Sequence, residues 1–304
     1  MRVVDTGFHR PLFDAAYLVV ERGRAAFVDA GTNHSVPRLL AALAAEGLGV
    51  DAVDFVIPTH VHLDHAGGVG LLMRHLPEAR LIVHPRGARH LAEPGHLIRG
   101  ATAVYGPEEV ERSYGTLVPV EAGRISTTSE GETIELAGRP LLFLHTPGHA
   151  MHHHCIWDAA SRGFFTGDTF GLSYRDFDTA AGAWIMPTTT PVQFQPKALR
   201  LSIERMLAFD PDWIYVTHYG RVGDVARLAA LLLSQLDEMV AFALSTPPGP
   251  ERHARLMRGL KEIHLNSLRT HGVMLSDERI RELLALDLEL NAQGIAIWLD
   301  RATP

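Results

Sequence analysis

The segment from Thr59 to His65 holds the residues of this chain that are best suited to chemistry. It reads Thr-His-Val-His-Leu-Asp-His, which places His60, His62, Asp64 and His65 within six consecutive positions. Imidazole and carboxylate groups together are ligands for zinc, iron or manganese. No lysine or arginine stands among them, and this favours a metal site over a solvated, histidine-rich turn.

Three later segments each place one potential ligand directly after an apolar run. His149 follows the apolar residues 141–144 and a Pro-Gly turn, Asp168 follows residues 164–167, and His218 follows residues 213–217. The first cluster likewise follows the apolar run 53–57. Side chains at the carboxyl ends of strands can converge beyond the edge of a sheet. The spacing therefore predicts one site, built where four strands end.

These motifs resemble those of the metallo-β-lactamase superfamily of hydrolases. H-x-H-x-D-H begins at His60, T-P-G-H ends at His149, G-D ends at Asp168 and T-H ends at His218, in the family's order. The resemblance covers about the first three quarters of the chain. It implies an α/β fold, the αββα sandwich of two mixed sheets flanked by helices, here with a C-terminal helical extension.

The resemblance also implies a site for two divalent metal ions. Zinc is expected, with iron or manganese as alternatives, and a hydroxide that bridges the ions would be the nucleophile. The implied ligands are His60, His62 and His149 for one ion, Asp64, His65 and His218 for the other, and Asp168 between them.

The substrate is less defined than the metal site, because this superfamily acts on lactams, lactones, thioesters, phosphodiesters and persulfides. The chain resembles hydroxyacylglutathione hydrolases, but residues 170–177 differ from their C-G-R-containing loop. Hydrolysis of a small ester, thioester or lactone is expected. The alternatives are an iron-dependent redox enzyme, persulfide dioxygenase-like or di-iron, and a phosphodiesterase. Di-iron relatives typically carry glutamate where His62 stands, which favours hydrolysis.

Three residues near the ligands are candidates for substrate binding. Tyr174 and Arg175 begin an irregular segment after Asp168, and Tyr219 follows His218. A preorganised phenol can donate to a developing oxyanion, so Tyr174 is assigned a catalytic role together with Asp64. Arg175 could pair with an anionic substrate. Packing of both tyrosines against the loop is the competing interpretation.

Other residues near the motifs are expected to support the structure, or have two interpretations that the sequence leaves open. Asp29, in Asp-Ala-Gly, either orients the ligand loop from behind or only turns the chain. Cys155 is expected to be a small buried residue. Two groups of histidines have no motif partner. We expect the first to lie behind the ligands or on the surface: His152, His153 and His154. We expect the second to lie on the surface: His253, His264 and His271.

The elements that must position these residues follow from hydrophobic periodicity and turn signals. Strands are expected in a hairpin over 17–28, at 53–57 and 80–83, and from 124 to 167, with helices over 36–48 and 67–76. Residues 170–196 are expected to form an irregular wall of the substrate cleft. Three helices are predicted over 225–244, 253–271 and 277–299. Two domains follow, a metallo-β-lactamase-fold domain at 1–222 and a helical domain at 223–304.

Composition narrows the class of protein. The chain has 304 residues and a formal net charge of −7 without a basic block, so nucleic acid is not an expected partner. The single cysteine excludes an intramolecular disulfide framework. No apolar run of membrane-spanning length and no secretory signal is recognised. We expect a cytoplasmic protein with a small-molecule substrate, no membrane partner and possible homodimer formation.

Overall fold

The computed structural model describes residues 1–189 and 192–302, which form two compact units. The first unit comprises Met1–His145, His152–Gly167 and Pro211–Gly223, and the second comprises Thr146–Met151, Asp168–Asp210 and Asp224–Pro304. The division into domains at residue 222 stays a prediction. Residues 190 and 191, within the predicted cleft wall, lie outside the described residues.

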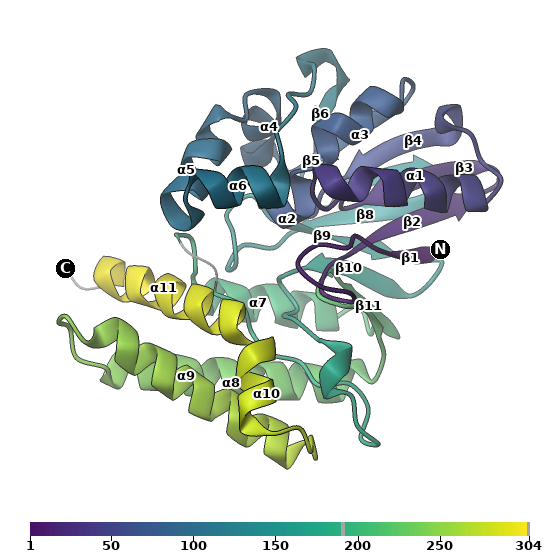
Figure 1. Ribbon diagram of the computed structural model, residues 1–304. Helices are drawn as coiled ribbons and strands as arrows, with labels where there is room; N and C mark the ends of the chain where they lie inside the picture. The colour runs from purple at the N-terminus through teal and green to yellow at the C-terminus, as the bar shows by residue number, and fades with distance from the viewer. Residues whose placement is uncertain (190–191, 303–304) are drawn as a thin grey trace. The chain divides into compact units, whose positions relative to one another are not determined.

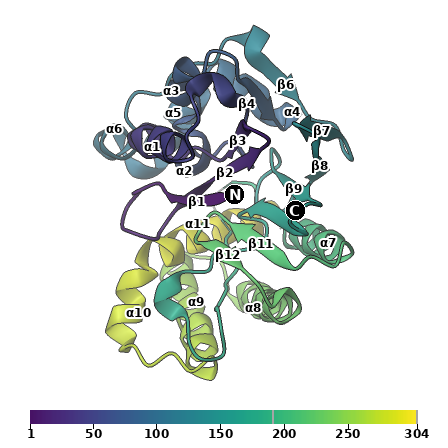
Figure 2. The same cartoon turned by 90° about the vertical axis from the view of Figure 1, so that its right-hand side faces the viewer.

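The first unit contains two six-stranded sheets (Figures 1 and 2). The first sheet has the order β1 (Arg2–Asp5), β2 (Ala15–Glu21), β3 (Arg24–Val28), β4 (Val53–Ile57), β5 (Arg80–Val83) and β6 (Ile125–Thr127). The second has the order β12 (Gly220–Val222), β11 (Trp213–Val216), β10 (Gly163–Gly167), β9 (His154–Asp158), β8 (Arg139–His145) and β7 (Thr133–Leu136). Both sheets are mixed, since β3 to β6 pair in parallel, as do β10 and β11.

The hairpin β2–β3 shows how local sequence sets the register. Glu21 pairs with Arg24, which leaves Arg22 and Gly23 as a two-residue turn with φ angles of 47° and 78°. Two successive positive φ values define the turn type whose twist matches that of the flanking strands. The predicted hairpin over 17–28 is therefore confirmed.

Two hydrophobic layers hold the first unit together. Between the sheets, side chains such as Tyr17 and Ile57 from one sheet contact Phe143, Phe165 and Tyr215 from the other. On the outer face of the first sheet, α1 (Val36–Ala45) and α3 (Val69–His75) bury their apolar faces against β1 to β5. The remaining α-helices in the described part of this unit are α2 (Leu63–Ala66), α4 (Pro85–Ala92), α5 (Gly95–Tyr105) and α6 (Pro107–Tyr114).

The helix predicted over residues 67–76 begins two residues late because two glycines separate it from the metal loop. Gly67 and Gly68 lie between α2 and α3. A Cβ atom at Gly68 would lie 2.5 Å from the carbonyl oxygen of Thr32 and 2.8 Å from that of Ala30. Only glycine permits this close approach of two backbones, and it fixes the direction in which the loop leaves the helix.

The second unit is helical apart from its irregular segments. It contains the short 3₁₀ turn η4 (Arg175–Phe177), α7 (Pro196–Leu207), α8 (Val225–Ser245), α9 (Arg252–Thr270), α10 (Asp277–Leu283) and α11 (Ala285–Ala302). The single helix predicted over 277–299 is divided into two helices, α10 and α11, because the chain turns at Leu284. Helix α9 contacts both α8 and α11 (Figure 1).

Helix α8 has the length and apolar character of a membrane-spanning helix, with a mean hydropathy of 1.5 in its most apolar window. The prediction that no run approaches that length was wrong for residues 225–245. Core helices of soluble proteins meet the same two criteria, and this is weak evidence for a membrane. In the second unit α8 contacts α7, α9 and α11.

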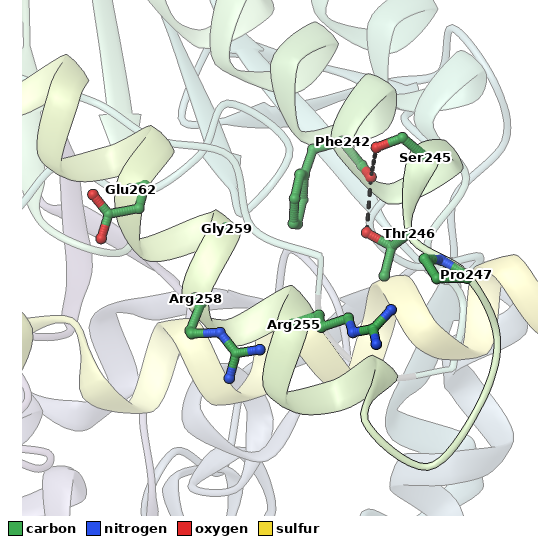
Figure 3. Close-up of a pocket in the computed structure, with 8 residues that line it drawn as sticks. All are labelled: Phe242, Ser245, Thr246, Pro247, Arg255, Arg258, Gly259 and Glu262. Carbon is green, nitrogen blue, oxygen red and sulfur yellow. Dashed lines mark hydrogen bonds between the residues drawn. The ribbon is translucent and has the colours of Figure 1, made fainter.

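A surface groove of about 380 Å³ lies where α8 ends beside α9 (Figure 3). The Phe242 ring forms its inner wall, and the Phe242 carbonyl accepts hydrogen bonds from the hydroxyls of Ser245 and Thr246. A Cβ atom at Gly259 would lie 2.0 Å from the Phe242 ring. Glycine at that position therefore lets the aromatic ring lie directly on α9.

Candidate metal centre

The predicted metal loop leaves β4 at the carboxyl end of that buried strand, in the first unit. His60 and His62 lie in the extended part of the loop, and Nε2 of His60 is 2.8 Å from Nδ1 of His62. Asp64 and His65 lie in the single turn of α2 that follows. The loop therefore presents its four potential ligands from two adjacent local structures.

Asp64 and His65 lie beside His218, which follows β11 in the same unit. One potential ligand atom from each of these three residues lies within 4.8 Å of the other two. Oδ2 of Asp64 is 3.5 Å from Nε2 of His218 and 3.8 Å from Nε2 of His65. The structure therefore brings together, from the ends of β4 and β11, the three residues predicted to bind one ion.

Hydrogen bonds behind this cluster assign the tautomer of both imidazoles. Nδ1 of His218 is 2.8 Å from the Phe13 carbonyl oxygen, and Nδ1 of His65 is 3.0 Å from Oδ2 of Asp29. A carbonyl or carboxylate oxygen accepts only, so each Nδ1 carries the proton. Each Nε2 then faces Asp64, and in a neutral ring this is the nitrogen that is available to bind a metal ion.

Asp29 is the residue that joins the two ligand-bearing loops. Its carboxylate accepts hydrogen bonds from the backbone N–H of Thr59 at 2.7 Å and from the Thr217 hydroxyl at 2.8 Å. It also accepts the hydrogen bond from Nδ1 of His65. Asp29 is 1% exposed and has a φ of 59°. Of the two interpretations of its Asp-Ala-Gly motif, orientation of the ligands from behind is the one that the hydrogen bonds support.

We predict that Asp29→Asn weakens metal binding about 10–100-fold, the usual effect of losing an outer partner of a ligating histidine. The new amide N–H₂ group is a donor, and it would face the donors from which the carboxylate now accepts hydrogen bonds. Competition with a chromophoric chelator measures the affinity. Asp158→Asn is the matched control, because Asp158 is also buried in this unit but accepts from Arg139 at 2.9 Å. Equal losses of affinity in both variants would contradict the role of Asp29.

The other two predicted ligands, His149 and Asp168, lie next to each other in the second unit. Nε2 of His149 is 3.3 Å from Oδ2 of Asp168, and both side chains are buried. Helix α7 holds the turn before His149. The Ser202 hydroxyl donates to the Pro147 carbonyl at 2.7 Å, and a Cβ at Gly148 would lie 2.3 Å from Leu199. The T-P-G-H motif therefore needs its glycine for packing against α7.

The predicted substrate residues have these positions. Tyr174 is fully buried, and its hydroxyl lies 3.1 Å from Oδ1 of Asp287 on α11. Arg175 donates to the Ser173 carbonyl at 3.1 Å and lies 3.3 Å from Asp178. Tyr219, in the first unit, is half-buried. The catalytic role of Tyr174 and the substrate contacts of all three residues stay predictions.

Buried hydrogen bonds tie the irregular segment 172–189 to the C-terminal helices of the second unit. Besides the Tyr174–Asp287 contact, Asn291 Oδ1 accepts from the Thr189 N–H at 2.7 Å, and Gln235 Nε2 donates to the Ile185 carbonyl at 2.6 Å. These residues are not among those predicted from the sequence. Their signal is a polar side chain on an otherwise apolar helix face, which indicates a buried partner.

His264 belongs to this network, so the prediction that it lies on the surface was wrong. It faces α8 from α9 and is fully buried, with Nδ1 3.0 Å from Oε1 of Gln235. Burial lowers the pKa of His264 to about 4, because the charged form loses its hydration. His253 is exposed and His271 half-buried, as befits residues near helix ends.

We predict that His264→Gln reduces the acid sensitivity of the protein. Below pH 6.5 the unfolded chain binds a proton that the native His264 refuses until about pH 4, so stability falls as pH falls through this window. At pH 5 the loss relative to pH 8 is about 2 kcal/mol for this one group. Urea unfolding at both pH values measures it, with His253→Gln as the exposed control. An unchanged pH dependence in His264→Gln would contradict the assignment.

The three consecutive histidines after His149 are all buried, so their surface interpretation was wrong. His153 stacks on His60 with ring centroids 4.8 Å apart, and His152 lies edge-on to His62 at 5.5 Å. Both therefore lie behind the metal loop, as the alternative interpretation had it. Cys155 is free and buried, which confirms its structural role.

Comparison with known proteins identifies the family of the chain. The family model of the metallo-beta-lactamase superfamily matches residues 9–218. The metallo-beta-lactamase fold-containing protein ST1585 of Sulfurisphaera tokodaii is 24% identical over 289 residues, or 94% of this chain and 91% of that protein. A solved structure of ST1585, from Sulfolobus tokodaii, has a TM-score of 0.63 over 88% of this chain and 98% of its own. Because the two sequences are only 24% identical, this similarity shows a shared fold and no more.

Two relatives with named activities match about half of the chain. The acyl-coenzyme A thioesterase MBLAC2 of Gallus gallus is 30% identical over 50% of this chain and 56% of its own. The hydroxyacylglutathione hydrolase of Salmonella typhi is 28% identical over 52% of this chain and 49% of its own. The family match covers strands β2 to β11 and the segments that carry all seven predicted ligands. This chain is therefore a member of the metallo-beta-lactamase superfamily of metal-dependent enzymes.

Proposed function

We propose that the protein is a dinuclear, metal-dependent hydrolase of small thioesters, with esters and lactones as further substrates of the same reaction class. The observation that carries the proposal is the cluster of Asp64, His65 and His218. Nδ1 of each imidazole donates to an oxygen behind it, and each Nε2 atom turns toward one carboxylate. A divalent cation fits this donor set, because two imidazole nitrogens and a carboxylate oxygen lie within 4.8 Å of one another.

The second ion would take the remaining four ligands. The family motifs supply these ligands, with His60 and His62 in the first unit and His149 and Asp168 in the second. Three imidazoles and one carboxylate form a donor set that suits zinc. Two bound divalent ions would supply Lewis acidity and a bound water with a pKa near 7.

The chain's own residues would then hold these ligands in place and orient them. Asp29 and the Phe13 carbonyl fix His65 and His218 in the ligating tautomer, so binding need not reorganise either ring. Preorganisation of this kind keeps the cost of ordering out of the reaction itself. We propose that three residues contact the substrate: Tyr174, Arg175 and Tyr219.

Thioesters are placed first among the substrates because of the two partial relatives. One is an acyl-coenzyme A thioesterase and the other a hydroxyacylglutathione hydrolase. The hydrolytic site requires no serine or cysteine nucleophile, and Cys155 is buried within β9. The segment after Asp168 lacks the C-G-R sequence expected of glutathione-thioester hydrolases. An acyl group on a different thiol is therefore the proposed substrate.

A matched substrate panel tests the proposal. The protein, loaded with zinc, is given the same acyl group as a coenzyme A thioester, a glutathione thioester, an oxygen ester and a lactone, beside a phosphodiester. Thiol release from the coenzyme A thioester is expected to be fastest, and His65→Gln to abolish it. Turnover of the phosphodiester alone, or oxygen consumption by the iron-loaded protein with a persulfide and no hydrolysis, would refute the proposal.

A further inference from the structure

His154 is a buried histidine that none of the predicted ligand sets uses. It is the first residue of β9 in the second sheet, and its ring is fully buried beside Phe143, with centroids 4.9 Å apart. Strand positions facing a core are normally apolar. A histidine there requires partners for both of its ring nitrogens.

Those partners include the backbone that leads into the metal loop. Nε2 of His154 lies 3.0 Å from the Pro58 carbonyl oxygen, and its backbone N–H donates to the Thr59 carbonyl at 2.9 Å. Pro58 and Thr59 are the two residues that immediately precede His60. One residue of the second sheet therefore holds two consecutive carbonyls where the loop leaves the first sheet.

The second ring nitrogen fixes the direction of these hydrogen bonds. Nδ1 of His154 is 3.0 Å from the Thr128 hydroxyl, which in turn lies 3.5 Å from Nε2 of His145. Because the Pro58 carbonyl can only accept, Nε2 of His154 carries the proton and Nδ1 accepts from Thr128. Burial lowers the pKa of His154 to about 3, so the ring keeps this neutral form.

We propose that His154 is a positioning residue for the metal loop. Its ring N–H and backbone N–H hold the Pro58 and Thr59 carbonyls, and this sets the direction in which His60 and His62 leave β4. An apolar residue at position 154 would keep the backbone contact but leave the Pro58 carbonyl without the ring donor. A buried carbonyl that loses its donor carries a desolvation penalty. We expect the Pro58 peptide to relieve this penalty by reorienting, and His60 to move with it.

The inference rests on the proposed metal site and is tested on the whole protein with cobalt. His154→Leu removes the ring donor, whereas the amide of His154→Gln can still donate to Pro58. We expect His154→Leu to weaken Co²⁺ binding about 10-fold or more, the range for outer partners of ligands, and to change the visible d–d spectrum. His154→Gln is expected to restore most of the affinity and the wild-type spectrum.

Ile156→Ala is the matched control, because Ile156 lies on the same strand, fully buried between the sheets. It is expected to lose about 2–5 kcal/mol of stability and to keep the cobalt affinity and spectrum. If His154→Leu fails to fold, His154→Asn, whose shorter amide falls short of Pro58, carries the same test. Wild-type affinity and spectrum in the leucine or asparagine variant would overturn the role of His154. A wild-type chain that binds no cobalt would overturn the metal site, and this inference with it.

Discussion

Replacing Asp168 by alanine is expected to lower kcat/KM for thioester hydrolysis by more than about 100-fold, because loss of a ligand should exceed the 10–100-fold effect of losing an outer partner. Asp168 lies 3.3 Å from His149 and is proposed to bridge both ions. Its loss would then disturb both coordination spheres. Steady-state kinetics with metal content measured on the same samples test this.

Tyr174→Phe is the comparison variant for Asp168→Ala. It removes a single hydroxyl, which lies 3.1 Å from Asp287 within the second unit. A donor to a developing oxyanion can be worth about 10²–10³ in kcat, so a loss as large as that of Asp168→Ala would show that the phenol acts on the substrate. A smaller loss is expected. Far-ultraviolet circular dichroism of both variants establishes that each is folded.

Removal of metal is expected to abolish hydrolysis and to lower the melting temperature. Elemental analysis should find about two ions per chain, as for other two-metal sites. A ligand present at 100 times its Kd stabilises the native state by about 2.7 kcal/mol. For a chain of this size each kcal/mol corresponds to about 2–4 °C in Tm, so chelation should lower Tm by several degrees.

Readdition of zinc, iron and manganese in separate samples identifies the metal that supports activity. Recovery of both activity and Tm by zinc is expected. At most one tightly bound ion after reconstitution with any of the three would contradict the dinuclear site and favour a single-iron redox enzyme. The stability measurement is independent of the substrate, so it tests the metal site even if the proposed thioester is wrong.

Local sequence predicted the parts of the site that local physics determines. An apolar run followed by Thr or Gly and then a ligand identified the strand ends that carry His65 and His218, and the structure brings those residues together. Arg22-Gly23 similarly predicted its hairpin turn. These signals lie within a few residues of the feature that they determine.

The missed features depend on contacts between distant segments. The surface prediction for His264 is wrong because its own helix gives no sign of Gln235, 29 residues earlier, as a hydrogen-bond partner. The sequence around His154 does not decide between its two interpretations, because its partner Pro58 lies 96 residues away. Tertiary packing decides whether such a polar side chain is solvated or buried, and the residues next to it in the sequence do not name its partner.

The Asp29 carboxylate has a consequence for the order of events during synthesis. It accepts hydrogen bonds from Thr59, 30 residues later, and from Thr217, 188 residues later. At about 5–20 residues per second, the ribosome takes about 10–40 s to add the residues between Asp29 and Thr217. The nascent chain thus exposes the histidines of the 59–65 loop well before the residue that completes their support exists. Selective, tight metal capture would then be a late step of biogenesis, and a chain released before Thr217 would carry a metal loop without its finished anchor.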